Sequence, residues 1–276
     1  MHLFFNADRD FKRKMINNKK VIVIMPAYNA EKTLKQTYDE IYKDFVDEVI
    51  LVDDNSQDNT KLVSKELNIK TIVHKENKGY GGNQKSCYKA ALQSGGDIIV
   101  MLHPDYQYTP KLIPAIVCMM AFGQYDAVLA SRMLGNSALK GGMPFYKFVA
   151  NKFLTWFENL FTGENLTEYH TGFRGFTKEV LQTLPLGECD DDFIFDNEII
   201  ALLFYNKYKI GEISCPTKYF KEASSINFVR SCKYGLGVLA VSLKYRLAKM
   251  GLFKSRIFRP DAKKLDLSTE IEYYYK

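Results

Sequence analysis

The chain has 276 residues, of which 46% are hydrophobic, enough for one large domain with an extensive core. Its 38 Lys and Arg against 32 Asp and Glu leave a net charge of +6, a small surplus that argues against binding of nucleic acid. Five scattered cysteines without CxxC spacing predict reduced thiols in a cytoplasmic compartment. We expect no signal peptide and no spanning helix, because no run reaches the ~18 apolar residues that a membrane span requires.

Strands and helices are predicted to alternate over the first 130 residues. A continuous apolar run over residues 21–25 is typical of a strand buried on both faces of a sheet. Further strands are predicted over 49–52, 71–73, 98–102 and 127–130, with helices over 34–41, 58–67 and 111–120 and another ending at Gln93. This alternation predicts an α/β fold, a mostly parallel Rossmann-like sheet flanked by helices.

After Arg132 the pattern changes to fewer strands and longer helices. We predict loops over 135–142 and 162–171, helices over 145–161 and 193–206, a strand over 210–216 and a polar link over 218–225. The predicted organisation is a basic extension over 1–20, a main domain over 21–225 whose halves are 21–132 and 133–225, and a C-terminal helix and tail over 226–276.

Residues 226–250 are predicted to form one long amphipathic helix with basic residues among its apolar ones. One interpretation is a helix packed on the main domain. The other is an interfacial helix that makes a peripheral contact with an anionic membrane.

Polar and aromatic residues follow the first two predicted strands. Pro26, Ala27 and Tyr28 place a rigid turn and an aromatic ring at the end of the first strand, where the ring can stack on a base. Asp53 and Asp54 end the second strand. Adjacent acids at the tip of a buried strand are costly, so we expect them to serve function.

The stretch over residues 100–110 runs from the fourth strand into a polar loop with His103, Asp105 and Gln107. Thr109 and Pro110 then predict the N-cap and first residue of a helix. Ligands of open α/β sheets bind at the carboxyl ends of strands, so this loop is predicted to face the first two strands' ends.

Together these motifs resemble family 2 glycosyltransferases with the GT-A fold, and within them the dolichyl-phosphate mannose or glucose synthase-like group. The resemblance covers roughly residues 20 to 250. It is carried by Pro26-Ala27-Tyr28-Asn29, Val52-Asp53-Asp54-Asn55-Ser56, Asn77-Lys78-Gly79, Asp105-x-Gln107, Ser131-Arg132, Thr171-Gly172-Phe173-Arg174 and Phe195-Asp196-Asn197-Glu198.

The resemblance implies a role for each matching residue. Lys78 and Gly79 would belong to the loop that closes on the nucleotide, and Arg132 and Arg174 would lie near the donor and acceptor phosphates. Asp105 and Gln107 would bind a divalent metal. The nucleotide base and ribose would be held by Pro26, Ala27, Tyr28 and Asp54, with Asp53 and Glu31 beside them.

One position departs from the family pattern. The family usually has Asp-x-Asp-x-Gln in this loop, and here His103 replaces the first acid. One carboxylate, an amide and diphosphate oxygens still suit Mg²⁺ or Mn²⁺. Ligation by His103 would favour Mn²⁺, whereas a histidine that only hydrogen-bonds the loop would leave the metal to Asp105 and Gln107.

The expected reaction is an inverting transfer from a nucleotide-diphosphate sugar to a polyprenyl-phosphate or saccharide acceptor in glycan or cell-envelope biosynthesis. We assign Asp105, Asp196 and Arg174 as the catalytic residues. A sugar hydroxyl needs a general base, for which Asp192, Asp196 and Glu198 are candidates and Asp196 is preferred. A polyprenyl phosphate is already anionic and needs cations such as Arg174 instead.

Three other classes of protein are alternatives. A sugar nucleotidyltransferase or a nicotinamide dehydrogenase would carry a glycine-rich loop after the first strand, and Pro26-Ala27-Tyr28-Asn29 is not one. A degenerate module that binds a nucleotide sugar without transferring it is made conceivable by His103. We expect a cytoplasmic protein working at the inner face of the membrane, with UDP-sugars as the first choice of donor and GDP-mannose as the second. The oligomeric state stays open.

Overall fold

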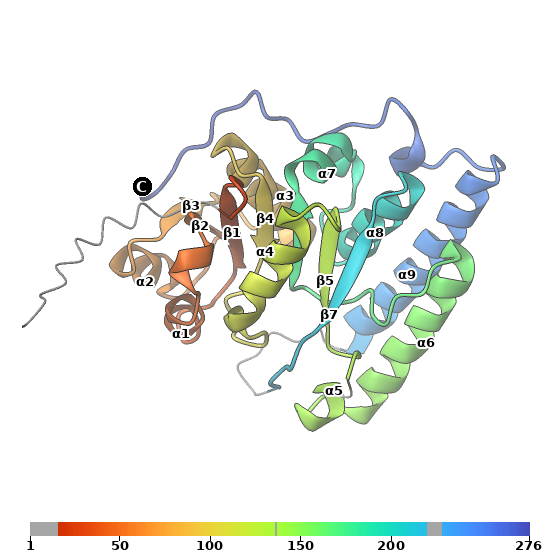
Figure 1. Cartoon of the computed structure of the whole chain (residues 1–276), viewed down its shortest axis with the longest axis horizontal. Helices are drawn as coiled ribbons and strands as arrows, with labels where there is room; N and C mark the ends of the chain where they lie inside the picture. The colour runs from red at the N-terminus through yellow and green to blue at the C-terminus, as the bar shows by residue number, and fades with distance from the viewer. Residues whose placement is uncertain (1–15, 136, 220–227) are drawn as a thin grey trace, which may run out of the picture.

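A seven-stranded sheet in the order β3-β2-β1-β4-β6-β5-β7 forms the centre of the molecule (Figure 1). The computed structural model describes residues 16–135, 137–219 and 228–276. Neighbouring strands are parallel except at β6, which runs antiparallel to both β4 and β5. The predicted α/β fold with a mostly parallel sheet is confirmed. The strands are β1 (Val21–Ala27), β2 (Glu48–Asp53), β3 (Lys70–Val73), β4 (Ile98–Met101), β5 (Ala127–Ser131), β6 (Arg174–Thr177) and β7 (Ile210–Ser214).

Two apolar clusters cover the two faces of the sheet, because successive side chains of a strand point to opposite faces. Ile22 and Ile24 of β1 belong to the cluster with α3 and α8, whereas Val23 and Met25 belong to the cluster with α1 and α4. Every residue of β1 is buried, as its unbroken apolar run predicts. The helices concerned are α1 (Leu34–Asp39), α2 (Thr60–Glu66), α3 (Gly79–Gln93), α4 (Ile113–Ala121) and α8 (Phe195–Tyr205).

Among the described strands and α-helices, the sequence does not predict β6 and the short helices α5 (Ser137–Lys140) and α7 (Lys178–Thr183). Sequence 135–142 was predicted as a loop, and α5 lies inside it. In β6, a Cβ at Gly175 would lie 2.5 Å from Met120 Cε of α4, so the strand needs glycine for α4 to approach. Thr109 takes the N-cap position and Pro110 is the first helical residue, as predicted, but the first turn, Pro110–Leu112, is a 3₁₀ helix and the Thr109 side chain makes no capping hydrogen bond.

The long helices α6 (Phe145–Thr162) and α9 (Phe228–Lys249) pack along each other at one edge of the molecule (Figure 1). The helix predicted over 226–250 therefore forms over its described part. Most of the predicted link 218–225 and of the extension 1–20 lies outside the described residues. Within the described ranges, no helix combines the length and apolar character needed to cross a membrane.

The C-terminal tail returns across the molecule to the edge strand β3. Leu265, Leu267 and Ile271 pack against the cluster that contains α3 and α8. The Thr71 N–H donates to the carbonyl of Tyr275 at 2.8 Å, and the Tyr274 N–H donates to the carbonyl of Thr71 at 2.8 Å. The tail thus covers part of the otherwise unpaired edge of β3.

Candidate active site

The predicted site residues meet at one edge of the sheet. Strands β1, β2, β4 and β5 are parallel, so the loops that follow them leave from the same edge. Ala27 and Asp53, which end β1 and β2, are paired in register. Because β6 is antiparallel, its first residue, Arg174, lies at this edge opposite Met101. The antiparallel strand therefore adds a cation to an edge that is otherwise formed by strand ends.

Asp53 and Asp54 are buried and hydrogen-bonded within the protein. Asp53 accepts hydrogen bonds from the backbone N–H and the hydroxyl of Ser56, and burial raises its pKa. Asp54 pairs with His74 Nδ1 at 2.7 Å and accepts from the backbone N–H groups of Lys78 at 2.8 Å and Gly79 at 3.1 Å. Asp54 therefore fixes the loop that includes Lys78 and Gly79, a structural role beside the predicted nucleotide contact.

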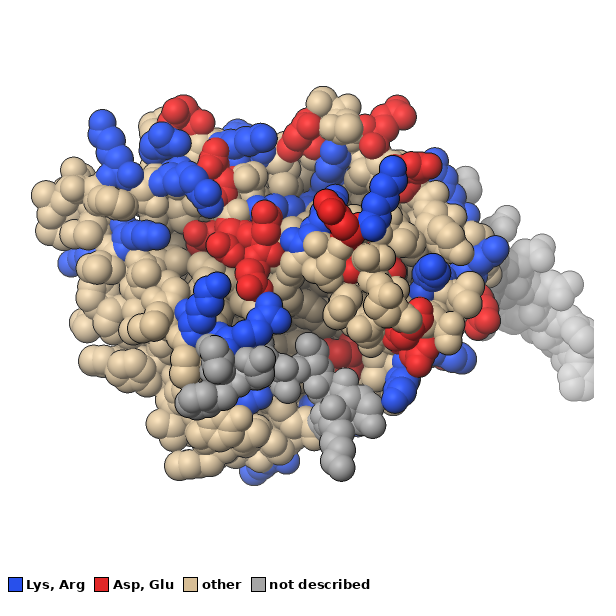
Figure 2. Space-filling view, turned by 180° about the vertical axis from the view of Figure 1, so that it is seen from behind, with Lys and Arg blue, Asp and Glu red and all other residues tan. Residues whose placement is uncertain are grey.

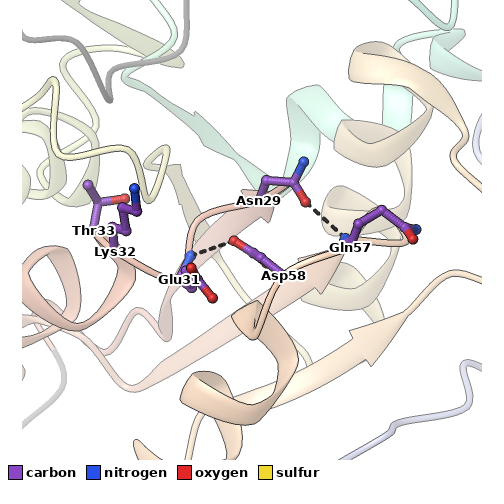
Figure 3. A pocket seen from close by; sticks show the side chains of 6 residues that line it. All are labelled: Asn29, Glu31, Lys32, Thr33, Gln57 and Asp58. Atoms are coloured by element: carbon purple, nitrogen blue, oxygen red, sulfur yellow. Dashed lines mark hydrogen bonds between the residues drawn. The ribbon is translucent and has the colours of Figure 1, made fainter.

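A polar hollow of about 410 Å³ lies between the loops after β1 and β2 (Figure 3). Glu31 Oε2 accepts from the Asn59 N–H at 2.9 Å, so this carboxylate supports the start of α2. Asp58 Oδ1 accepts from the N–H of Thr60, the first residue of the same helix, at 2.9 Å. The Tyr28 ring is 55% exposed at the end of β1, a position open to stacking. The hollow is lined by Asn29, Glu31, Lys32, Thr33, Gln57 and Asp58.

Behind the edge, Arg174 and Asp196 form a buried ion pair. The Arg174 guanidinium is fully buried and its Nη2 lies 2.9 Å from Asp196 Oδ2. Asp196 also accepts from the Tyr80 hydroxyl at 2.9 Å and from Gln84 Nε2 at 2.9 Å. Three donors therefore hold one carboxylate, and that carboxylate keeps the Arg174 charge compensated.

His103 lies against this pair. Its ring stacks on Tyr80 with centroids 5.4 Å apart, and a Cβ at Gly172 would lie 2.6 Å from the imidazole, so Gly172 makes room for the ring. The Tyr80 hydroxyl lies 3.1 Å from His103 Nε2. An ionised Asp196 accepts only, so the hydroxyl donates to Asp196 and accepts from His103 Nε2–H. Burial lowers the pKa of His103, and the neutral ring keeps its lone pair on Nδ1.

The loop after β4 holds donor atoms that the protein does not use. Asp105 is half-buried, and one oxygen accepts the Gln107 N–H at 3.1 Å to form an Asx turn. Within the described ranges, the Gln107 amide and His103 Nδ1 have no hydrogen bond, and no three His, Cys, Asp or Glu side chains gather as a metal cluster. An oxygen pair from this loop fits a cation that shares its shell with substrate phosphates.

Arg132 does not reach this loop as a free cation. Its Nε donates to Glu168 Oε1 at 2.7 Å, its Nη2 also pairs with Glu168, and its Nη1 donates to the Tyr219 hydroxyl at 3.1 Å. Burial alone would raise the pKa of Glu168, but the Arg132 charge lowers it. The ion pair joins the end of β5 to the loop before β6.

A second buried polar group lies where α6, α8 and α9 meet. Asn197 Nδ2 donates to Glu158 Oε1 at 2.6 Å, the Tyr234 hydroxyl donates to Asn197 Oδ1 at 2.7 Å, and His170 Nδ1 lies 2.9 Å from that hydroxyl. Glu158 Oε2 and His170 Nε2 lie 3.2 Å apart, but within the described residues neither atom makes a hydrogen bond. We call these four side chains the Glu158 ring.

Sequence reasoning found the edge but missed several partners at it. Tyr80 and Gln84 are spaced as one face of α3 and carry a weak signal, because polar residues also occur at exposed helix positions. Glu168 and His170 stand in a loop just before Thr171, and acids and histidines there are a usable signal. Of the other base candidates, Asp192 pairs with Arg230 and Glu198 accepts from the Asp190 N–H at 2.6 Å.

An α/β sheet with polar and charged residues gathered at its carboxyl edge is typical of a ligand-binding enzyme of the α/β class, and comparison with known proteins gives the family. Residues 22–184 match the family model described as glycosyl transferase family 2. The match covers more than half of the chain. The chain therefore belongs to glycosyl transferase family 2, and it is a glycosyltransferase.

Relatives and solved structures agree with this assignment. A UDP-N-acetylglucosamine–dolichyl-phosphate N-acetylglucosaminyltransferase of Methanococcus voltae is 30% identical over 219 residues, which cover 73% of this chain and 87% of that one. An undecaprenyl-phosphate 4-deoxy-4-formamido-L-arabinose transferase of Proteus mirabilis is 29% identical over 60% of this chain and 51% of that one. The Mycobacterium tuberculosis glucosyl-3-phosphoglycerate synthase, solved with Mn²⁺ and UDP-glucose, shares the fold with a TM-score of 0.62 and 18% identity over 86% of this chain and 82% of that one.

Proposed function

We propose that the chain transfers a sugar from a nucleotide-diphosphate sugar to a polyprenyl phosphate, with inversion at the anomeric carbon. In this reaction a phosphate oxygen forms a bond to the anomeric carbon, and the bond from that carbon to the diphosphate breaks. Dolichyl and undecaprenyl phosphates are the acceptors named for the two relatives above. UDP-N-acetylglucosamine is the first donor to test, because the Methanococcus voltae relative is named for it.

The contacts of the Asp196 carboxylate support a phosphate acceptor over a sugar hydroxyl. A sugar hydroxyl must lose its proton to a base, and a base needs an uncommitted lone pair. Asp196 is buried, pairs with Arg174 and accepts from Tyr80 and Gln84, so three donors already occupy its carboxylate and an ion pair holds its charge. A phosphate monoester is already anionic at neutral pH and needs no base. The engaged carboxylate therefore supports a phosphate acceptor over a saccharide one.

Asp105 is proposed to hold the divalent metal together with Gln107. Of the four acids at the edge, Asp53, Asp54 and Asp196 are each bound by at least two donors, whereas Asp105 accepts one backbone N–H. A bound Mg²⁺ or Mn²⁺ would neutralise charge on the departing diphosphate. Asp105 and Gln107 would position the metal ion. His103 Nδ1 would either be a third ligand or stay unbound.

The proposed nucleotide contacts follow the same edge. Tyr28 is proposed to stack on the base, beside Pro26, Ala27 and the acids Asp53 and Asp54, while the Lys78 loop approaches the phosphates. Arg132 and Arg174 are proposed to act through the field of their ion pairs, since both guanidinium groups are already bound to acids. Glu31 is proposed only as the outer wall of the polar hollow.

Donor turnover tests the proposal. UDP-N-acetylglucosamine, UDP-glucose and GDP-mannose are each incubated with Mn²⁺, Mg²⁺ or EDTA, with and without polyprenyl phosphate, and released nucleotide is measured. We expect release that needs the metal and rises with the lipid. Asp105→Asn should lower kcat by about 10²–10³ because the diphosphate loses its charge partner. Asp39→Asn, an exposed acid paired with Lys35, is the control.

Two other results of this assay would contradict the proposed function. Turnover that rises only with a saccharide acceptor contradicts the phosphate acceptor. If a donor binds but is not consumed with any acceptor, the result contradicts transferase activity and supports the degenerate binding module. In that case His103→Asp, which restores the family's usual acid, is the next variant to assay.

A further inference from the structure

Helix α6 exposes apolar side chains and buries polar ones, the reverse of an ordinary surface helix. Its large apolar side chains point outward at spacings of three and four residues, which place them along one face of a helix. Trp156, at the centre of this row, is 58% exposed. We call this row the α6 stripe: Tyr146, Val149, Phe153, Trp156 and Leu160, all of them exposed.

The opposite face of α6 is polar and buried. Asn151, Thr155, Glu158 and Thr162 recur at the same spacing and are all nearly inaccessible to solvent. Glu158 belongs to the ring with His170, Asn197 and Tyr234. The fold therefore holds α6 by polar contacts and leaves its apolar face uncovered. A stripe of this length on a monomer marks a surface that binds something.

The charges around the stripe indicate what it binds. Lys152 is exposed beside it, and the single acid of α6, Glu158, is buried. Helix α9, packed along α6, has no acid and presents exposed Leu236 and Leu243. In Figure 2 the edge that these two helices form, at the left, is mostly tan with scattered Lys and Arg side chains. The basic residues of α9 are Arg230, Lys233, Lys244, Arg246 and Lys249.

We propose that the α6 stripe is the surface by which this protein docks on an anionic membrane, with α9 lying beside it. Aromatic and aliphatic side chains would enter the region between lipid headgroups and acyl chains, and the flanking cations would meet the lipid phosphates. A second copy of the chain fits less well, because a two-fold interface would bring each cationic flank against its own copy. From the sequence, a membrane contact is one of two interpretations of the 226–250 helix, and the exposed side chains place the centre of the surface on α6 instead.

The Glu158 ring connects this surface to the candidate active site. Glu158 of α6 and Tyr234 of α9 both contact Asn197 of α8. Asn197 follows Asp196, which pairs with Arg174 at the sheet edge. Docking through α6 and α9 would therefore hold the acceptor side of the site at a fixed position relative to the lipid surface. The docking proposal adds to the proposed function without depending on it, because it concerns binding to lipid and not turnover.

Trp156 gives a direct measurement, because it is the only tryptophan in the sequence. The full chain is mixed with vesicles of phosphatidylglycerol in phosphatidylcholine, and Trp156 fluorescence is recorded without donor or acceptor. We expect a blue shift with these vesicles, a weaker one with phosphatidylcholine alone, and a loss as salt is raised, because salt screens the contact between cations and lipid phosphates. Absence of a shift with anionic vesicles overturns the proposal.

Flotation with the same vesicles tests the stripe by substitution. The double variant Phe153→Ser/Leu160→Ser keeps Trp156 and changes only exposed side chains, so we expect normal folding and at least about a tenfold lower partition coefficient. Phe122→Ser, which removes an exposed aromatic ring at the end of α4, is the matched control and should bind as the unchanged chain does. Equal partitioning of the double variant contradicts the α6 stripe as the docking surface.

Two further measurements separate the remaining explanations. A blue shift that appears without lipid and grows with protein concentration, together with a dimer that the double variant loses, would assign the stripe to a second copy and overturn membrane docking. Turnover with a detergent-dispersed polyprenyl phosphate should be the same in the double variant and the unchanged chain. Equal turnover with lost vesicle binding separates docking from catalysis, so either proposal can fail alone.

Discussion

The buried ion pair of Arg174 and Asp196 stabilises the fold and also lies at the candidate active site. Replacing Arg174 with Met would leave the Asp196 carboxylate buried without its cation, so we expect the free energy of unfolding to fall by about 3–5 kcal/mol. Urea unfolding measures this. Arg259→Met, at an exposed pair with Asp261, should change it by less than ~0.5 kcal/mol.

The same pair determines how an Asp196 variant must be interpreted. Asp196→Asn removes the counter-charge of Arg174, so we expect it to lower turnover by displacing Arg174 and not by the loss of a base, with little change in donor binding. Its loss of activity is therefore compared at equal folded fraction. If the Arg174→Met/Asp196→Asn double variant loses as much stability as the sum of the two single variants, the ion pair is not coupled as the 2.9 Å contact implies.

Gly172 is expected to tolerate no larger residue, because the His103 ring lies against it. An Ala at this position would place its Cβ 2.6 Å from His103 Cδ2, so the imidazole must move and its contact with Tyr80 must break. We expect Gly172→Ala to lower kcat roughly tenfold or more while the chain still folds, because displaced catalytic geometry is costly. Metal titration of activity gives the readout, and Gly235→Ala, in α9 where an added Cβ meets no neighbouring atom within 4 Å, is the comparison. Unchanged metal dependence and rate would show that the position of His103 does not matter.

Among the elements, α6, α8 and α9 depend on the proton held in the Glu158 ring. Burial raises the pKa of Glu158 well above its usual value and lowers the pKa of His170 to about 4. The folded ring thus carries one proton at neutral pH, on Glu158. The unfolded chain carries none on this pair above pH 6.5, the ordinary value for histidine, and two below pH 4.5, the ordinary value for glutamate.

The sign of the pH dependence follows from these proton numbers. Above pH 6.5 the folded pair binds more protons than the unfolded pair, so its contribution to stability falls with pH by up to about 1.4 kcal/mol per unit until Glu158 ionises. Between pH 4.5 and 6.5 the numbers match and the contribution is constant. Below pH 4.5 stability falls again, but only to about pH 4, where folded His170 takes up its proton.

Glu158→Gln isolates this effect, because an amide imitates the protonated carboxyl and does not titrate. We expect the stability of the variant relative to the unchanged chain to rise with pH from 4.5 upward, by up to about 1.4 kcal/mol per unit. Urea unfolding of both chains from pH 5 to 9 gives the difference, with Glu272→Gln, at an exposed site, as the control. A constant difference across this range would mean that Glu158 ionises normally in the folded state.

The same elements show how far the sequence leads. The strands β1, β2 and β4 were predictable because each is an unbroken apolar run, and the site loops follow them directly. Strand β6 was not, because Arg174 and Gly175 interrupt any apolar pattern and its burial depends on α4 and α8, far away in the chain. The pairing of Arg132 with Glu168, and of Asp54 with the Lys78 loop, depends in the same way on distances that no spacing in the sequence contains.

At the scale of the whole molecule, the tail joins parts that are far apart in the chain. Deleting residues 264–276 would uncover the cluster beneath Leu265, Leu267 and Ile271, so we expect about 3 kcal/mol less stability, from partial burial of several apolar side chains. It would also open the β3 edge, so light scattering should increase on mild heating. Tyr274→Ser, at an exposed tail position, is expected to do neither. If the chain without residues 264–276 is as stable as the intact chain, the tail does not contribute to stability.

The contact of the tail with Thr71 has a consequence during synthesis. Strand β3 emerges from the ribosome early, and its outer edge stays unpaired until Tyr274 and Tyr275 are made. Throughout that interval the nascent chain exposes a strand edge, the feature that most readily recruits another copy on a crowded polysome. A pause in translation after α9 would lengthen the exposure, so the speed at which the codons between α9 and Tyr275 are read sets how long this edge needs a chaperone.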